Sequence, residues 1–143
     1  MQSLSHSDVI AMMEPMGTVW VQEHAQGIDV EISCGTDRRD PCVYAWVVDR
    51  EIIYLGKAGQ GLARRMREHE RGMKSKGGST RGQSHAAYLA QLTEQHRTVM
   101  LYALWPEPVM FREHSIASHS SVEDWLIAAF EPTPVRNREA KTA

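Results

Sequence analysis

The clearest alternation of hydrophobic and polar residues lies in the middle of the chain, between residues 41 and 59. Two runs rich in β-branched and aromatic residues, PCVYAWVV and IIYLGKAG, are separated by the polar residues 49–51, a pattern typical of a β-hairpin. If these three residues form the loop, the directly opposite pairs are Val48 and Ile52, Trp46 and Tyr54, and Tyr44 and Gly56. Both tyrosines then lie on one face of the hairpin, whereas a two-residue loop would place them on opposite faces.

Helical spacing dominates the sequence after Gly59 and Gly61. Apolar side chains recur at helical intervals over residues 62–73, over residues 85–95 and from about Ser120 or Ser121 onward. The side chains predicted to be buried are Leu62, Met66, His69 and Met73; Ala86, Leu89 and Leu92 or Ala90; and Val122, Trp125, Leu126 and Ala129. Residues 98–105 predict a third strand, and residues 74–84 predict a loop because they are rich in Gly, Ser and basic side chains.

The first 40 residues carry weaker patterns. Residues 8–13 predict a short helix, capped by Ser7 and ended by Pro15 and Gly17. Residues 18–21 and 28–32 alternate as short strands do. The polar run GTDRRD at residues 35–40 then predicts a loop that leads into the hairpin.

Composition supports one folded domain. The chain has 143 residues, of which 42% are hydrophobic and 24% charged, so it is large enough to bury a core. It lacks both a secretory signal pattern and an apolar run long enough to span a membrane, and we therefore expect a cytoplasmic, soluble protein. Cys34 and Cys42 do not have zinc-site spacing; reduced thiols fit a cytosolic protein, and a disulfide between them stays open.

Charge is unevenly distributed along the sequence. Residues 57–81 carry eight basic and two acidic side chains, a local +6, so the remainder of a chain with net charge -2 carries -8. Such an arrangement attracts a polyanion to one face. An ordinary solvated helix face is the alternative explanation.

The order of motifs from Val43 to Asn137 resembles the GIY-YIG endonuclease family. The dipeptide VY at residues 43–44 stands for the last two letters of GIY, and YLG at residues 54–56 stands for YIG; an Arg and a His on a helix, a Glu and an Asn follow in the family's order. Cys42 replaces the first glycine and Leu55 the isoleucine, which are mild departures because the tyrosines carry the family's chemistry.

The resemblance implies an α+β fold with a small mixed or antiparallel three-stranded sheet, over residues 43–48, 52–55 and 99–104, flanked by helices. It divides the chain into an N-terminal extension at residues 1–40, a nuclease domain at residues 41–137 and a tail at residues 138–143. The implied activity is metal-dependent hydrolysis of phosphodiester bonds in DNA, with RNA as an alternative substrate.

In this family-based view Tyr44 activates water and Tyr54 orders water or contacts the phosphate. A free phenol has a pKa of about 10 and is only about 0.1% ionised at neutral pH, so Tyr44 needs a nearby cation. Lys57, directly after YLG, or the metal would supply it. The alternative for both tyrosines is a structural role on a strand. The alternative for Lys57 is an ordinary surface lysine.

Arg65 is the residue expected to neutralise the scissile phosphate. Its spacing from Leu62 and His69 matches the family and distinguishes it from Arg64 and Arg67. His69 is expected to transfer a proton or bind phosphate, and its alternative role is that of a helix histidine at the edge of the core.

Glu123 corresponds to the family's metal-binding glutamate, with Asn137 following 14 positions later. One carboxylate and several waters suit Mg2+, or Mn2+ in its place. Ser120 and Glu123 also have the spacing of a capping box, in which the glutamate would only satisfy a helix N-terminus.

Further residues are expected to contact nucleic acid: Arg64, Arg67, Lys74, Lys76, Arg81 and Asn137, with Gln83 and His85 extending the site from the loop. Double-strand cleavage would require a homodimer or two binding events, and residues 1–40 are the candidate for dimer or target contacts. Two other classes of protein remain: a nucleic-acid-binding module that keeps the scaffold without turnover, and a protein interaction domain, which leaves the tyrosines unexplained.

Overall fold

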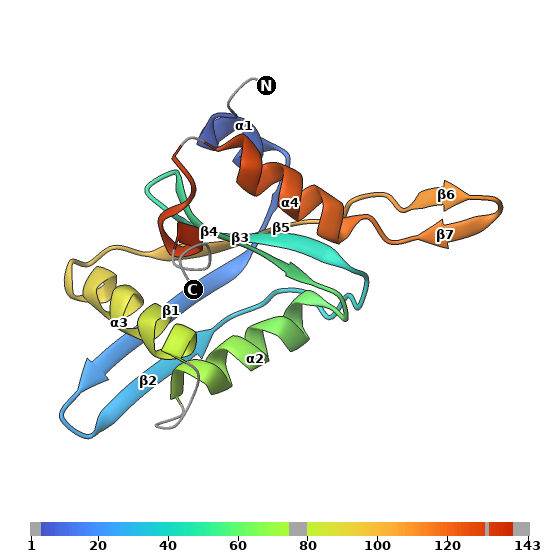
Figure 1. The fold of residues 1–143 in the computed structure, drawn as a ribbon. Coiled ribbons are helices and arrows are strands. Elements are labelled where there is room, and N and C mark those ends of the chain that lie inside the picture. Colours follow the sequence, from blue (N-terminus) through green and yellow to red (C-terminus); the bar gives the residue numbers. More distant parts are fainter. Residues whose placement is uncertain (1–3, 75–79, 131, 139–143) are drawn as a thin grey trace.

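The computed structural model describes residues 4–74, 80–130 and 132–138, which surround a five-stranded sheet (Figure 1). The strand order is β2 (Gly27–Ile32), β1 (Glu14–His24), β5 (Val99–Leu104), β3 (Cys42–Val48) and β4 (Glu51–Ala58). All neighbouring strands are antiparallel. The α+β class is confirmed, but the sheet is larger than the three strands expected, because β1 pairs with β5 and adds the hairpin of residues 14–32 to the same sheet.

Helices cover both faces of the sheet (Figure 1). On one face lie α2 (Leu62–Lys74) and α3 (Thr80–Glu94), and on the other α1 (His6–Ala11) and α4 (His119–Ala129). Every residue of β3 is buried, since side chains from alternate positions enter the two opposite cores. This explains why its sequence is continuously hydrophobic.

The β3–β4 hairpin turns differently from the expectation. Asp49 and Arg50 form a two-residue turn, with φ of 48° and 65°, and Val48 pairs with Glu51, so the predicted Val48–Ile52 pair is wrong. The pairs Trp46–Tyr54 and Tyr44–Gly56 are confirmed. Ile53 has no partner on β3 and forms a bulge. This extra residue reverses the face of all residues that follow it. The pairs Trp46–Tyr54 and Tyr44–Gly56 are therefore kept although the turn is one residue shorter than expected.

The starts of two helices are corrected. Ser5 rather than Ser7 caps α1, where its hydroxyl accepts a hydrogen bond from the Asp8 amide at 3.0 Å. Helix α1 ends before Pro15 and Gly17, and both of these residues lie in β1. Helix α3 begins at Thr80, so residues 80–84 are helical rather than part of a loop. Residues 75–79, including Lys76, lie outside the described residues, as do residues 139–143 of the predicted tail.

Helix α4 bears directly on the role of Glu123. The residue before its first turn is Ser118, which makes no side-chain capping bond, and Ser120 lies inside the helix. The capping box that was the alternative explanation for Glu123 is therefore absent. Leu126 and Ala129 are buried as expected, whereas Trp125 is 51% exposed, because helix α4 lies on the sheet with only one face.

The remaining elements lie between β5 and the end of the described chain. Strands β6 (Val109–Phe111) and β7 (His114–Ile116) form a separate ribbon, not predicted, that projects from the body of the protein (Figure 1). A 3-10 helix, η1 (Val135–Asn137), packs against β4. Cys34 and Cys42 are free thiols. Among the described residues, none of the helices has the length and apolarity to cross a bilayer.

Candidate active site

The candidate residues gather at the free edge of the sheet, beside the end of β4. Strand alternation sends Tyr54 and Gly56 toward α2 and Lys57 toward α4. A cavity of about 450 Å3 opens between these two helices. Its lining comprises Tyr54, Lys57, Ala58, Gly59, Gln60, Gly61, Arg64, Arg65, Glu68 and Glu123. Four of the predicted catalytic residues, Tyr54, Lys57, Arg65 and Glu123, thus share one cavity.

Tyr44 lies beneath this cavity and is completely buried. Its ring crosses Gly56 on the neighbouring strand: a Cβ at position 56 would lie 2.4 Å from both the Tyr44 Cζ and Oη atoms. Only glycine leaves room for the ring there. Gly56 therefore permits the Tyr44 ring to lie close to β4, with the Tyr44 hydroxyl directed toward α2.

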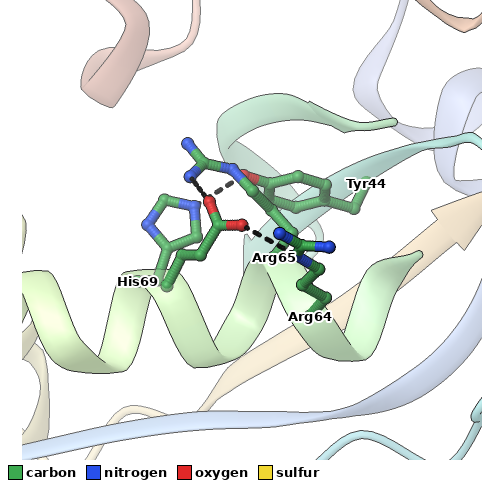
Figure 2. Close-up of polar contacts among 5 residues, drawn as sticks. Tyr44, Arg64, Arg65 and His69 are labelled. Carbon is green, nitrogen blue, oxygen red and sulfur yellow. Dashed lines mark hydrogen bonds and ion pairs between the residues drawn. The ribbon is translucent and has the colours of Figure 1, made fainter. Parts of the chain in front are cut away.

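The Tyr44 hydroxyl meets His69 of α2, with 2.6 Å between Oη and Nε2 (Figure 2). Burial, together with the positive charge of Arg65, lowers the pKa of His69 to about 2, so the imidazole is neutral at physiological pH. Burial also raises the pKa of Tyr44, and Arg65 opposes that rise only in part. A neutral phenol therefore faces a neutral imidazole whose Nε2 can accept its proton.

Arg65 separates the buried pair from the cavity. One of its guanidinium nitrogens lies 3.1 Å from a carboxylate oxygen of Glu68, and the other oxygen of Glu68 lies 3.7 Å from Arg64 (Figure 2). The Arg65 side chain is 35% exposed, so the guanidinium reaches the cavity as well as Tyr44. Glu68 was not among the predicted site residues, although its spacing from Arg64 and Arg65 on a helix gives such pairs.

Glu123 approaches the cavity from α4, on the opposite face of the sheet. Burial raises the pKa of its carboxyl group, while Lys57 opposes the rise. It has no hydrogen-bonding or ionic partner within residues 4–74, 80–130 and 132–138, apart from these longer-range charges. A half-buried carboxylate with free oxygens that faces a cavity is a suitable ligand for a hard cation.

No group of three or more His, Cys, Asp or Glu side chains gathers to hold a metal in the described part of the chain. This donor set does not fit a structural zinc site, which needs four protein ligands. It fits Mg2+ or Mn2+ held by Glu123 and waters, because Mg2+ keeps several waters and takes one or two carboxylates.

A second layer of aromatic and basic side chains supports Tyr54 and His69. His85 of α3 packs 4.9 Å from the Tyr54 ring and 5.8 Å from that of His69, between ring centroids. Arg136 of η1, which is 4% exposed, donates to His85 Nδ1 at 3.1 Å, and the bond assigns the Nδ1 lone pair as acceptor. Arg81 lies over the Tyr54 ring at 5.5 Å. The role of Arg136 was missed because only the fold brings η1 to α3.

Asn137 lies behind the site rather than in it. Its side-chain oxygen accepts from the Leu55 amide and its nitrogen donates to the Leu55 carbonyl, both at 2.8 Å. These are the main-chain groups that edge strand β4 would otherwise leave unpaired. Asn137 is 6% exposed, so the amide is committed to positioning β4.

The other residues expected to contact nucleic acid are spread over the surface. Arg64 and Arg67 are exposed on α2, and Lys74 at its end pairs with Glu70 at 2.8 Å. Gln83 lies on α3, beside Lys74 in a different hollow. The fold therefore brings Arg64 to the cavity and leaves Lys74 and Gln83 apart from it.

Comparison with known proteins finds the fold but no family assignment. No family model and no curated protein matches the chain. EndoII of bacteriophage T4, solved as a mutant, is similar with a TM-score of 0.62 and 17% identity, over 89% of this chain and 96% of that one. Restriction endonuclease HPY188I in complex with product DNA is similar with a TM-score of 0.51 and 13% identity, over 85% and 75%. The chain thus has a fold that these two nucleases also use.

Proposed function

We propose that this protein is a metal-dependent DNA endonuclease of the GIY-YIG type. The observation that carries the proposal is the convergence of Tyr54, Lys57, Arg65 and Glu123 on one cavity from opposite faces of the sheet edge. Three cations, Lys57, Arg64 and Arg65, and two carboxylates, Glu68 and Glu123, surround a space of about 450 Å3. Such a site suits a phosphodiester held beside a divalent ion. The endonucleases with the same fold, one of which was solved with product DNA, support the same substrate class.

Different residues of the protein have different roles in the proposed hydrolysis. Lys57 and Arg65 hold the phosphate, and water attacks phosphorus while the bond to the leaving 3' oxygen breaks. Tyr44 takes a proton from that water and passes its own proton to His69 across the 2.6 Å contact. This relay puts a positive charge on His69, which burial and the charge of Arg65 oppose in the resting structure, so it requires Arg65 to move away and water to reach the pair. Mg2+, or Mn2+ in its place, would be held by Glu123 and would stabilise the charge on the leaving oxygen.

Substrate must rearrange Arg65 before this relay can operate. Tyr44 is completely buried in the structure and lies under the Arg65 guanidinium. A phosphate in the cavity competes with Glu68 and Tyr44 for that guanidinium, and movement of Arg65 toward the phosphate opens a path from Tyr44 to water. Phosphate binding and exposure of the general base are coupled in this scheme.

A second candidate function follows from the same burial. If Arg65 stays on Tyr44 and Glu68, the protein binds nucleic acid without cutting it. The basic side chains around the cavity serve this function equally well.

Supercoiled plasmid distinguishes the two functions. We expect nicking with Mg2+ or Mn2+, none with EDTA, and a loss of at least about 100-fold in Glu123→Gln and in Tyr44→Phe. Asp124→Asn is the matched control, because it removes a neighbouring exposed carboxylate of the same helix. DNA binding in a gel shift without nicking by the unaltered protein, in either metal and on duplex, single-stranded and RNA substrates, would establish the binding module instead.

A further inference from the structure

A second hollow, of about 720 Å3, adjoins the candidate active-site cavity. It is lined by Asp37, Arg38, Arg39, Gly59, Gln60, Gly61, Ala63, Arg64 and Arg67. Gly59, Gln60, Gly61 and Arg64 line both hollows, so the two are continuous. One wall is α2, and the other is the segment 37–39 that precedes β3.

We propose that this second hollow is a backbone-binding groove for duplex DNA, which holds the phosphates next to the cleaved bond. The inference rests on the proposed nuclease function and adds a path for the substrate strand. It assigns a binding role to Arg39, which the charge pattern at residues 57–81 does not include.

Charge is the first argument. Four arginines and one aspartate line the groove, and the adjoining cavity adds Lys57 and Arg65 with Glu68 and Glu123. The two hollows together therefore hold six cations and three anions, a net +3, on a chain whose net charge is -2. The rest of the protein then carries -5, so the field directs a polyanion to this face.

The availability of the cations is the second argument. Arg39 and Arg67 are both exposed and have no acidic partner within the residues that the structure describes. Lys74 and Arg97, by contrast, are held by Glu70 and Asp49. Unpaired guanidinium groups on facing walls are suited to bidentate contacts with successive phosphates.

The rigidity of the groove is the third argument. Gly61 has φ of +105°, and a Cβ there would lie 3.0 Å from the Arg39 Cα and 3.1 Å from the Arg38 carbonyl oxygen. The Arg38 guanidinium is in turn bonded to Asp40 at 2.7 Å and lies over the Trp105 ring at 4.6 Å. Because segment 37–39 packs directly on the loop before α2, the two walls are ordered before DNA arrives.

Salt-dependent binding tests the proposal. We would measure the affinity of full-length protein for a fluorescent 30-base-pair duplex by anisotropy, in EDTA, at several NaCl concentrations. Arg39→Gln/Arg67→Gln should weaken binding by more than about 10-fold at physiological salt and lower the salt slope by about 1 to 2, because each phosphate contact contributes about 0.9.

Arg50→Gln/Arg97→Gln is the matched control. It removes the same charge beside the β3–β4 turn, at the other end of β4 and roughly 23 Å away for a strand of this length. Affinity and slope should stay within about twofold of the unaltered protein. Equal weakening by both double variants, or unchanged binding by Arg39→Gln/Arg67→Gln, would overturn the groove.

Two further outcomes distinguish failure of the groove proposal from failure of the proposed nuclease function. If the unaltered protein nicks plasmid but the groove variant binds duplex normally, the nuclease function stands and the groove fails. If no metal supports nicking yet the groove variant loses binding selectively, the groove stands and the nuclease fails. Loss of affinity for polyglutamate, with duplex binding absent, would assign the groove to an acidic polypeptide and also overturn the proposal.

Discussion

At the scale of single residues, the site depends on a buried phenol held between a glycine and an imidazole. Tyr44 needs both neighbours: Gly56 leaves space for its ring, and the His69 imidazole forms a hydrogen bond with its hydroxyl. Arg65 and Glu123 line the cavity beside this buried pair. Two substitutions test this arrangement without removing a charged group from the cavity.

Gly56→Ala should displace the Tyr44 ring. The new methyl group would lie within 2.4 Å of ring atoms, so we expect a loss of about 1–3 kcal/mol in the free energy of unfolding and slower nicking. Gly72→Ala is the control, since no atom lies within 4 Å of a Cβ on this helical glycine, and it should gain up to about 1 kcal/mol. Urea unfolding measures both; an unchanged stability in Gly56→Ala would contradict the close packing.

His69 should make the protein sensitive to mild acid. The folded protein lowers the pKa of His69 to about 2, whereas a histidine in the unfolded chain has a pKa of about 6.5. In mild acid the unfolded chain therefore binds a proton at His69 and the folded protein does not. The stabilising contribution is complete above pH 6.5 and is lost as the pH falls below it. Between pH 7 and 5 it amounts to about 2 kcal/mol.

The measurement is the free energy of unfolding at pH 7 and pH 5. His69→Gln should lose about 2 kcal/mol less than the unaltered protein over this interval. Tyr44→Phe keeps the buried imidazole and should retain the full acid dependence. Parallel curves for His69→Gln and the unaltered protein would show that His69 titrates normally.

At the scale of elements, strands β3 and β4 decide which residues meet. The turn at Asp49 and Arg50 and the bulge at Ile53 act together. Without the bulge, a two-residue turn would send Tyr54 to the face opposite Tyr44. With it, Ile53 and Tyr54 both enter the core beneath α2 and α3.

Arg50→Gly should stabilise the hairpin. Arg50 has φ of 65°, a left-handed conformation that favours glycine, and the net gain should be about 0.5–1 kcal/mol after the added flexibility of the unfolded chain. Glu51→Gly, one residue later in β4, should lose about 0.5–1 kcal/mol. Thermal unfolding measures both. If residues 49–51 formed a three-residue loop instead, Arg50→Gly and Glu51→Gly would change the stability in the same direction. That result would contradict the two-residue turn.

At the scale of the whole molecule, one chain presents one cavity with one candidate metal-binding carboxylate among the described residues. Under the proposed function, one such site would cut one strand at a time. The homodimer expected from the sequence stays a prediction, as does a role for residues 1–40 in dimer or target contacts, although strands β1 and β2 belong to the central sheet.

Plasmid cleavage should therefore pass through a nicked intermediate. Supercoiled DNA should convert first to open circles at a rate proportional to protein concentration, and linear DNA should appear later. If two chains must assemble for double-strand cutting, the yield of linear DNA should rise more steeply than linearly with concentration. Direct conversion of supercoiled to linear DNA at limiting protein would contradict independent single-strand cuts.

Local sequence patterns determined much of the fold and the candidate chemistry. The face of α2 that buries Leu62, Met66, His69 and Met73 follows from helical periodicity, a repeat set by backbone geometry. The predicted pairing of Tyr44 with Gly56 is present only because the bulge at Ile53 offsets a turn that is one residue shorter than expected. The motif order also named four residues that line one cavity. Tyr54, Lys57 and Arg65 belong to a hairpin and the helix that follows it, which remain near neighbours, whereas Glu123 reaches the cavity through the packing of α4 on the opposite face of the sheet.

Tertiary structure alone decided the rest. The sheet has five strands because β1 finds an edge on β5, a pairing between segments some 80 residues apart that no local period encodes. Long-range packing likewise placed Asn137 against Leu55, Arg136 against His85 and Arg39 opposite Arg67. Trp125 remained exposed and Ser120 failed to cap α4, since burial and helix starts depend on what packs against each element.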